Sequence, residues 1–167
     1  MLAAVTKSPG VMVIDDVAEP EPPGPIGLAT TLAVTAAGAR VMATDPVPGR
    51  RDLALAVGAE TVAWGSDGEL LEAVHAWTHR EGPPRVIDTP GDPAALAQAA
   101  RMVCSAGRVV VVGMSAAPAP LRSGVFPEKE IDVVGSSCAT APDFLAAVRL
   151  VQATGNQSPR FSRTASR

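Results

Sequence analysis

The sequence predicts an α/β fold with a doubly wound parallel sheet. From residue 26 onward, short apolar segments alternate with longer segments of helical pattern. This alternation is typical of β-α-β units, in which helices cover both faces of a parallel sheet. The stretch Arg108–Val112 is almost continuously apolar, as expected for a strand that is buried on both faces. A turn with two glycines, residues 24–27, stands before the first helix and also fits this class.

Each element has a local reason in the sequence. Ile26–Ala37 is rich in Ala, Leu and Thr, and Gly38 follows in the position of a helix C-cap. Ser66 is a candidate cap for a later amphipathic helix, and Asp92 before Pro93 marks the start of another. The remaining helices are expected at residues 49–57, 69–80, 93–102 and 142–154. The strands are expected at residues 41–44, 61–63, 85–88, 108–112 and 131–134, within a sheet of roughly six parallel strands.

The N-terminal part follows a different pattern. Leu2–Lys7 and Val11–Val17 are typical of two strands joined by a Ser-Pro-Gly turn. Prolines are dense in Glu19–Pro25, so this stretch cannot form a helix interior or a central strand. We expect three units: a hairpin and linker at residues 1–23, an α/β domain at 24–154, and a polar, disordered tail at 155–167.

Composition limits the classes of function. Hydrophobic residues make up 47% and charged residues 19% of the 167 residues, as in a globular domain. The net charge of −3 and the lack of a Lys/Arg block argue against a nucleic-acid partner. No apolar run approaches the ~20 residues of a membrane span, and the N-terminus lacks the pattern of a signal peptide. We therefore expect a cytoplasmic protein without a membrane partner.

The turn Gly24-Pro-Ile-Gly27 is the main candidate binding feature. Glycines let the backbone approach a pyrophosphate, and the helix that follows presents free N–H groups to the anion. Asp45 stands 18 residues after Gly27, at the end of a predicted strand, as does the carboxylate that accepts the ribose hydroxyls of a dinucleotide. Because a carboxylate repels a 2′-phosphate, NAD is expected over NADP. Arg50 or Arg51 could lie along the adenosine ribose or phosphate.

Plainer interpretations stay open at this stage. The glycine turn could be a proline-rich linker that runs into an ordinary helix, and Asp45-Pro46 is a common opening of a turn. Both arginines could be solvated. The turn also departs from the dinucleotide-binding pattern, because Pro22-Pro23 stands where an earlier glycine is expected.

Two further turns follow predicted strands, Asp88-Thr-Pro-Gly91 and Val112-Gly-Met-Ser115. Ligands of a doubly wound sheet bind at the carboxyl ends of its strands, so these turns are expected to line the cleft and offer backbone contacts. The alternative is a pair of tight turns with no ligand. Gly135-Ser-Ser-Cys138 also follows a predicted strand, but it is a weaker candidate for contact with a ligand.

No metal site is expected. His75 and His79 have the i, i+4 spacing that can hold a metal, but no third ligand accompanies them. Cys104 and Cys138 are expected to be buried, reduced thiols. The sequence contains no Cys-x-x-Cys pair and no Gly-x-Ser-x-Gly nucleophile turn.

Five segments match a known family in their order and spacing over residues 24–152. They are Gly24–Ala29, Val41–Asp45, Leu53–Ala59, Gly107–Gly113 and Lys129–Ser136. Together they resemble the cofactor domain of the medium-chain dehydrogenase/reductase family, in particular its zinc-containing alcohol, sorbitol and threonine dehydrogenase branch. The resemblance implies a Rossmann-like domain and an NAD-dependent oxidoreductase that passes hydride between a secondary alcohol and a ketone, with zinc polarising the oxygen.

The resemblance also implies the roles of single residues in cofactor binding. It places a pyrophosphate turn first, then a ribose carboxylate, a basic group near the adenosine, and four residues that flank the nicotinamide. In this order the residues are Gly24, Pro25, Ile26 and Gly27; Asp45; Arg50; and Thr89, Val112, Gly113 and Met114.

The catalytic domain that the resemblance implies has no counterpart here. Its zinc ligands, structural zinc lobe and proton relay find no matching positions, so the chain looks like an internally deleted dehydrogenase without catalytic or metal-binding residues. The strand that should precede Gly24 is missing as well, unless Val11–Asp16 replaces it. The edge strand Ile131–Val134 is expected to pair with a second copy, as the family's dimers imply.

The function expected from these observations is that of the NAD-binding domain of a zinc-type alcohol dehydrogenase-like oxidoreductase, inactive by itself. Two alternatives remain. The chain could be a nucleotide-binding module that performs no chemistry, or a non-functional remnant that neither binds a nucleotide nor folds stably.

Overall fold

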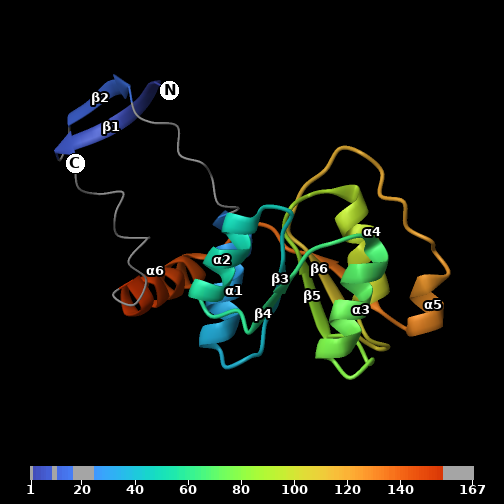
Figure 1. Ribbon diagram of the computed structural model, residues 1–167. Coiled ribbons are helices and arrows are strands. Elements are labelled where there is room, and N and C mark those ends of the chain that lie inside the picture. The colour runs from blue at the N-terminus through green and yellow to red at the C-terminus, as the bar shows by residue number, and fades with distance from the viewer. Residues whose placement is uncertain (1, 9–10, 17–24, 156–167) are drawn as a thin grey trace.

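The computed structural model describes residues 2–8, 11–16 and 25–155, and the side chains of residues 26–154. Figure 1 shows the arrangement of the elements. The strands are β1 (Leu2–Ser8), β2 (Val11–Asp16), β3 (Met42–Thr44), β4 (Thr61–Ala63), β5 (Arg85–Asp88), β6 (Arg108–Val111) and β7 (Asp132–Gly135). The helices are α1 (Pro25–Ala36), α2 (Pro48–Ala56), α3 (Asp67–Trp77), α4 (Pro93–Met102), α5 (Val125–Lys129) and α6 (Ala141–Gly155).

The N-terminal strands form the predicted hairpin. β1 pairs antiparallel with β2, with Val5 opposite Val13, in a separate two-stranded sheet. Val11–Asp16 therefore does not replace the first strand of the parallel sheet in this conformation. Among the described residues, no strand occupies the place of the first strand, which is the other of the two predicted alternatives.

Five parallel strands are described, and they form two sheets instead of the single sheet expected from the sequence. One sheet pairs β3 with β4, and the other has the order β5-β6-β7. The break between the two sheets lies between β3 and β5. These two strands face each other across one cleft, which both of them line. This is where a doubly wound sheet of the order 3-2-1-4-5-6 places its first strand.

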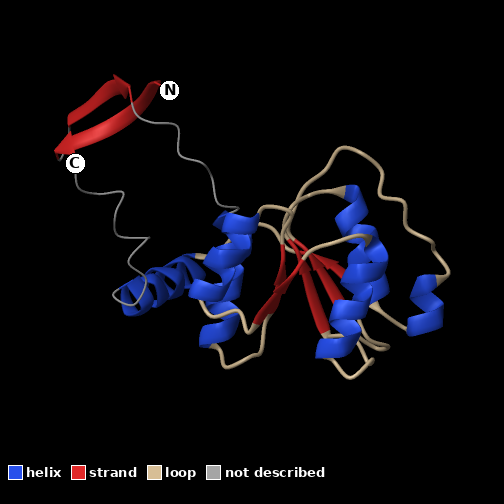
Figure 2. Cartoon of the chain, viewed as in Figure 1, coloured by secondary structure: helices blue, strands red, loops and turns tan. Residues whose placement is uncertain are grey.

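The strands are covered from both sides. In Figures 1 and 2 the helices α1 and α2 lie on one side of the strands, and α3 and α4 lie on the other. The core is divided in the same way. One buried cluster joins α1 and α2 to β3 and β4, around Leu28 and Ala54. A second joins α4 and α5 to the three-stranded sheet, around Val103 and Val109. A third, around Leu70, packs α3 and α4 against β3 and β4.

Several predicted boundaries are confirmed by local hydrogen bonds. Ser66 caps α3 and forms a capping box with Glu69, so this helix begins at Asp67. The Asp92 carboxylate accepts a hydrogen bond from the amide of Ala94 at the start of α4, 2.8 Å away. The sequence places the end of α3 too late, at residue 80. Its last turn closes earlier, where His79 and Arg80 take positive φ angles of 53° and 69°.

One helix is absent from the sequence prediction. The short α5 contains Pro127 and spans five residues, too few to show a helical period. Two predictions fall largely outside the described residues: the proline-rich linker at 17–24, and the tail, of which only Gly155 is described, as the end of α6. None of the described helices is long and apolar enough to cross a membrane.

Candidate functional site: a cleft at the carboxyl edge of the sheet

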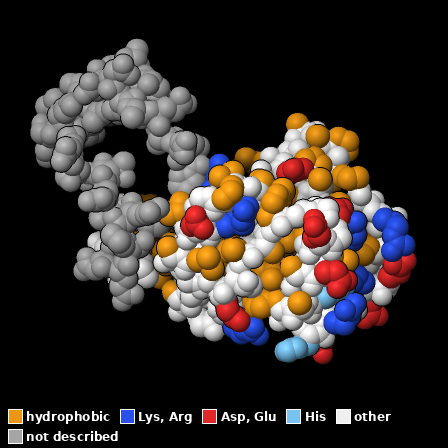
Figure 3. All heavy atoms as spheres, viewed as in Figure 1, with side chains coloured by type: hydrophobic (Ala, Val, Ile, Leu, Met, Phe, Trp, Pro, Cys, Tyr) orange, Lys and Arg blue, Asp and Glu red, His pale blue; other side chains and the backbone are white. Residues whose placement is uncertain are grey.

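A cleft of about 870 Å³ lies between the two half-sheets. Its lining comes from both facing strands, from α1 on one side and from α3 and α4 on the other. Figure 3 shows hydrophobic side chains in the hollow between these elements, with charged groups around it. The cleft runs along the strands, so its two ends differ. One lies where the strands end, near Asp45 and Thr89, and the other lies where they begin, near Trp77.

The carboxyl end brings together five residues that the sequence analysis selected. Side chains or backbone of Ile26, Gly27, Asp45, Arg50 and Thr89 all line the cleft there. They come from three separate elements: the first turn of α1, the segment from β3 into α2, and the end of β5. Parallel strands end at the same edge, and this is why residues so far apart in sequence meet. Gly24 lies outside the described residues, and the side chain of Pro25 is not described.

Asp45 is held in place by its own turn. Its Oδ1 accepts a hydrogen bond from the amide of Val47 at 2.8 Å, and its Oδ2 lies 3.7 Å from a guanidinium nitrogen of Arg50. The neighbouring Arg51 is engaged differently, because it donates to the carbonyl oxygens of Asp45 and Pro46 at 2.6 and 3.1 Å. Of the two arginines considered from the sequence, Arg50 therefore lies with the carboxylate in the cleft and Arg51 fixes the backbone.

Thr89 connects two parts of this edge. A Cβ on Gly27 would lie 3.2 Å from the Thr89 hydroxyl, so the start of α1 packs against the end of β5 with almost no spare room. On the other side, a Cβ on Gly113 would lie 2.1 Å from the backbone nitrogen of Gly91 and 2.9 Å from the Thr89 carbonyl. The turns after β5 and β6 thus touch through their backbones, which requires glycine at residue 113.

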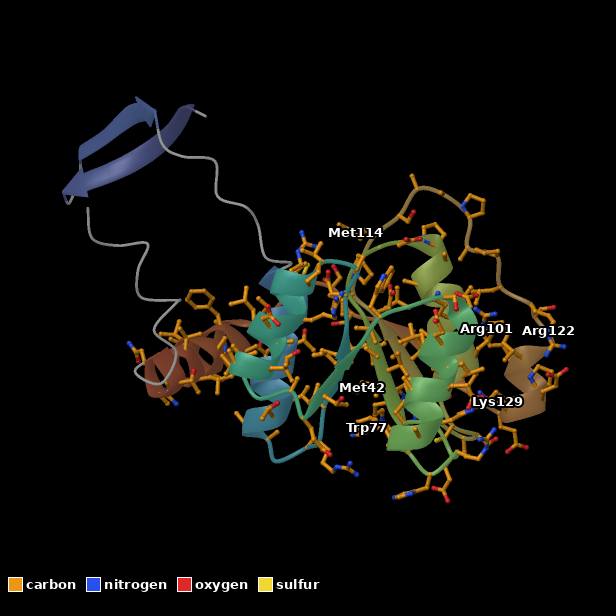
Figure 4. The ribbon with its side chains drawn as sticks, in the orientation of Figure 1. Met42, Trp77, Arg101, Met114, Arg122 and Lys129 are labelled. Carbon is orange, nitrogen blue, oxygen red and sulfur yellow. The ribbon has the colours of Figure 1, made fainter. Side chains whose placement is uncertain are left out.

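The turn after β6 does not reach into the cleft. The amides of Val112 and Gly113 donate to the carbonyl of Asp88, at 2.9 and 3.1 Å. Met114 is 93% exposed, and Figure 4 shows it at the edge of the molecule where the strands end. Val112, Gly113 and Met114 therefore lie beside the cleft and are absent from its lining. Their assignment to the nicotinamide stays a prediction.

Asp88 has a place in the cleft that the sequence pattern alone does not indicate. This residue ends β5, lines the cleft and is only 5% exposed. Burial raises the pKa of the Asp88 carboxyl above its usual value, and the negative charge of Asp92 raises it further. The available signal was a single acidic residue at the end of the apolar strand Arg85–Asp88, whereas its burial depends on the helices that cover the strand.

The opposite end of the cleft is basic and aromatic. Arg40 lies over the ring of Trp77, 5.2 Å from the centroid, and forms two hydrogen bonds with the carboxylate of Glu60 at 2.6 and 2.7 Å. These bonds lower the pKa of Glu60 and raise that of Arg40. His79 and Arg85 line the same end. Figure 4 shows Trp77 and Met42 at this end, away from Met114.

The three cationic residues labelled in Figure 4, Arg101, Arg122 and Lys129, bond to other groups of the protein. Lys129 donates to the carbonyl oxygens of Arg101 and Val103, at 2.7 and 2.5 Å, and burial lowers its pKa. The Arg101 side chain pairs with Asp67, and Arg122 pairs with Glu128. These partners close the C-terminal end of α4 and the loop before α5, so the groups do not form an anion site.

Among the described residues, no group of three His, Cys, Asp or Glu side chains could hold a metal ion. His75 lies beside Glu72, with Nδ1 3.9 Å from a carboxylate oxygen. Both cysteines are free, as expected. The expected burial is wrong for Cys138, which is exposed on the loop after β7, and Cys104 is only partly buried.

With this geometry in place, comparison with known proteins identifies the family. A family model described as zinc-binding dehydrogenase matches residues 25–153. The chain belongs to the zinc-binding dehydrogenase family. This confirms the resemblance derived from the five sequence segments, and the matched residues are the cofactor-binding part of such enzymes.

Relatives within this family agree with that result. The chain is 32% identical to the sorbitol dehydrogenase of Bacillus subtilis over 114 residues, which cover 67% of this chain and 32% of that protein. It is 26% identical to an NAD-dependent alcohol dehydrogenase of Saccharolobus solfataricus over 137 residues, 82% of this chain and 39% of that protein. A solved alcohol dehydrogenase from Thermotoga maritima shares the fold, with a TM-score of 0.75 and 22% identity over 83% of this chain and 40% of that one.

The matched length bears on function. The chain spans between about a third and two fifths of the length of these relatives. It therefore corresponds to one part of a zinc-type dehydrogenase, and the activity of a whole dehydrogenase does not transfer to it.

Proposed function

We propose that this chain is a dinucleotide-binding module of the zinc-type dehydrogenase family and binds NAD or NADH at the carboxyl end of the cleft. The observation that carries the proposal is the meeting of Asp45, Arg50, Thr89 and the first turn of α1 in one cleft. A helix N-terminus favours a pyrophosphate, and a carboxylate at the end of the neighbouring strand favours ribose hydroxyls.

The preference for NAD over NADP rests on Asp45. Its Oδ1 is fixed by the amide of Val47, so the carboxylate keeps one orientation toward the cleft. Two ribose hydroxyls can donate to it, whereas a 2′-phosphate would bring a second negative charge against it. Arg50 lies beside this carboxylate and is placed to contact the adenosine ribose or the pyrophosphate. The S. solfataricus relative is an NAD-dependent alcohol dehydrogenase, which is consistent with this preference.

Zinc chemistry does not fit the described residues. Zinc in these enzymes needs three or more ligating side chains, and no such group exists among residues 26–154. We therefore expect the chain alone to turn over no alcohol with NAD, because the catalytic half would have to come from outside these residues. The substrates of sorbitol and alcohol dehydrogenases are thus no guide to this chain.

Titration calorimetry or the fluorescence of NADH tests the proposal. We expect NADH to bind the wild-type chain and Asp45→Ala to weaken binding by about tenfold or more, since one lost charged hydrogen bond is worth roughly 1.5–3 kcal/mol. The same substitution should reduce the preference for NAD over NADP. Asp52→Ala is the matched control, because Asp52 is an exposed carboxylate outside the cleft.

Two results would count against the module. Failure of the folded wild-type chain to bind NADH would leave a non-functional remnant, which the gap in the sheet favours. Equal binding by wild type and Asp45→Ala would place the nucleotide elsewhere. Turnover of an alcohol by the purified chain would contradict the assignment of a module without chemistry.

Two further expectations accompany the module. A homodimer through the edge near Ile131–Val134 is supported by the partial exposure of Val133 and Val134 on β7, and sedimentation at several protein concentrations tests it. A cytoplasmic location stays a prediction from composition.

A further inference from the structure

The gap in the sheet is bordered by two strand edges. β3 pairs with β4 on one side, and β5 pairs with β6 on one side. Within the part of the chain that the structure describes, neither strand has a partner on its other side, and both of these sides face the cleft. β3 and β5 run in the same direction. Each offers unpaired backbone donors and acceptors along its open edge.

The walls of the gap are apolar above and below the plane of the strands. Leu28 and Val34 of α1 line it from one side, and Val74, Ala99 and Met102 of α3 and α4 line it from the other. A segment placed between β3 and β5 would therefore be covered on both faces. Such a position calls for a parallel strand with a continuous apolar run, because neither face meets water.

We propose that this gap is an acceptor site for the chain's own strand β2, which leaves its hairpin and inserts parallel between β3 and β5. The occupant is the apolar run Val11-Met-Val-Ile14, which has the composition that the gap requires. Its four residues match β5, which has four, and exceed β3, which has three. Its present partnership is weak, because an isolated two-stranded hairpin is marginally stable in water.

The connection to α1 has the right direction and enough length. A strand parallel to β5 must end at the carboxyl edge, and α1 begins at that edge, where Gly27 packs beside Thr89. Eight residues separate Asp16 from Pro25, and such a segment can reach about 25–30 Å when extended. Because the strand is tethered, its effective concentration at the gap is high, of the order of millimolar for a short linker.

Charge at the carboxyl edge opposes insertion and sets its extent. Val11–Ile14 would fill the gap and carry Asp15 and Asp16 to the edge where Asp45 and the buried Asp88 already lie. Repulsion between these carboxylates favours the hairpin. The double substitution Asp15→Asn and Asp16→Asn should therefore increase the inserted population, whereas Asp52→Asn on the exposed face of α2 should leave it unchanged.

Cysteine pairs can report the two conformations in the full-length chain. With Cys104 and Cys138 replaced by Ala, a Val5→Cys/Val13→Cys pair reports the hairpin, since these residues face each other in it. The pairs Val13→Cys/Ala43→Cys and Val13→Cys/Ile87→Cys report insertion. We expect at least one insertion pair to form an intramolecular disulfide under mild oxidation. A Val13→Cys/Val133→Cys pair, which places the second thiol on the distant β7, should form none.

Hydrogen exchange gives a second measurement that needs no cross-link across the gap. Locking the hairpin with the Val5→Cys/Val13→Cys disulfide should speed exchange of amides in β3 and β5, by about twofold if half of the molecules are inserted when the hairpin is free, since these amides lose their added partner. Reduction should restore protection. Val5→Asp disturbs only the hairpin, so it should slow hydrogen exchange of the amides in β3 and β5. Val13→Asp places a charge in the inserted strand and should speed this exchange.

The outcomes are distinct. Intramolecular cross-links with opposite effects of Val5→Asp and Val13→Asp support insertion. An insertion disulfide found only between two molecules would assign the gap to a second copy and overturn the proposal. The proposal also fails if neither insertion pair cross-links and edge exchange is the same with the hairpin locked or free. These measurements use no nucleotide, so they succeed or fail independently of NADH binding.

Discussion

The two half-sheets of this protein differ in how completely they are supported. In the sheet β5-β6-β7 the central strand has partners on both sides, and Val109 of β6 and Val103 after α4 are fully buried. In the sheet β3-β4 each strand has one partner, and the residues of β3 are partly buried or exposed. The strand paired on both sides therefore carries a fully buried core residue, whereas β3, with one edge open to the cleft, carries none.

The gap between the halves is energetically important. A backbone group buried without a partner costs about 1–3 kcal/mol, and the strand edges that line the gap would carry such groups if the cleft closed over them. A few of them would equal much of the roughly 5–15 kcal/mol that stabilises a domain. The halves are nevertheless joined, because the cluster around Leu70 packs α3 and α4 against residues of β3 and β4.

The largest difference between the regions is expected for core leucines. Leu70 is 2% exposed and is absent from the lining of the cleft, so Leu70→Ala should leave a closed cavity and cost about 3–5 kcal/mol. Leu28 is 5% exposed and lines the cleft, so its neighbours already have space, and Leu28→Ala should cost closer to about 2 kcal/mol. Urea unfolding of both variants measures this. Equal losses would mean that the gap is filled in solution.

The next largest loss of stability is expected where two backbone turns pack together at the carboxyl edge of the sheet. In Gly113→Ala the new Cβ would meet the backbone of Gly91 at 2.1 Å, so the two turns must separate, at an expected cost of about 1–3 kcal/mol. Gly49→Ala in the first turn of α2 is the control, because no atom lies within 4 Å of its Cβ position. Thermal unfolding of the two variants should differ clearly. A fully stable Gly113→Ala would show that these turns are not packed as described.

The buried carboxyl of Asp88 should make stability depend on pH. Its folded pKa is raised above the unfolded value, so the folded state binds the proton more tightly, and stability falls as pH rises from the ordinary carboxyl pKa through the raised one. Asp88→Asn removes this loss and should make the protein more stable than wild type at neutral pH. Urea unfolding at acidic and neutral pH measures the change. A variant less stable than wild type at neutral pH would indicate that the Asp88 carboxylate has a partner.

The smallest effect is expected on α6. Phe144 is 65% exposed and Leu145 is 55% exposed, so replacing Phe144 by Ser removes little buried surface. The change in the free energy of unfolding should stay within about 0.5 kcal/mol. A larger loss, or one that grows with protein concentration, would show that α6 packs against a second copy in solution.

Local patterns predicted most of the elements. Asp92 with Pro93 predicted the start of α4, and the apolar segments at Thr61–Ala63 and Arg85–Asp88 match β4 and β5 residue for residue. The spacing from Gly27 to Asp45 also selected residues that share one cleft. These successes have one cause, because caps, apolar periods and the common edge of parallel strands are encoded over short distances.

Other features could not be read from short segments. The sequence left open whether Val11–Asp16 joins the parallel sheet, because its apolar run suits a hairpin and a buried strand equally. The burial of Asp88 depends on helices from other parts of the chain. The exposure of Cys138 on the loop after β7 likewise depends on how distant elements pack.

The sequence by itself determined the family, the alternation of strands and helices and the residues at the carboxyl edge, since these depend on the order of residues along the chain. Only the tertiary structure decided that the sheet is split between β3 and β5 and that a cleft runs through the split. The physical reason is that strand pairing joins distant segments, and the energy of each pairing depends on which competing edges are available.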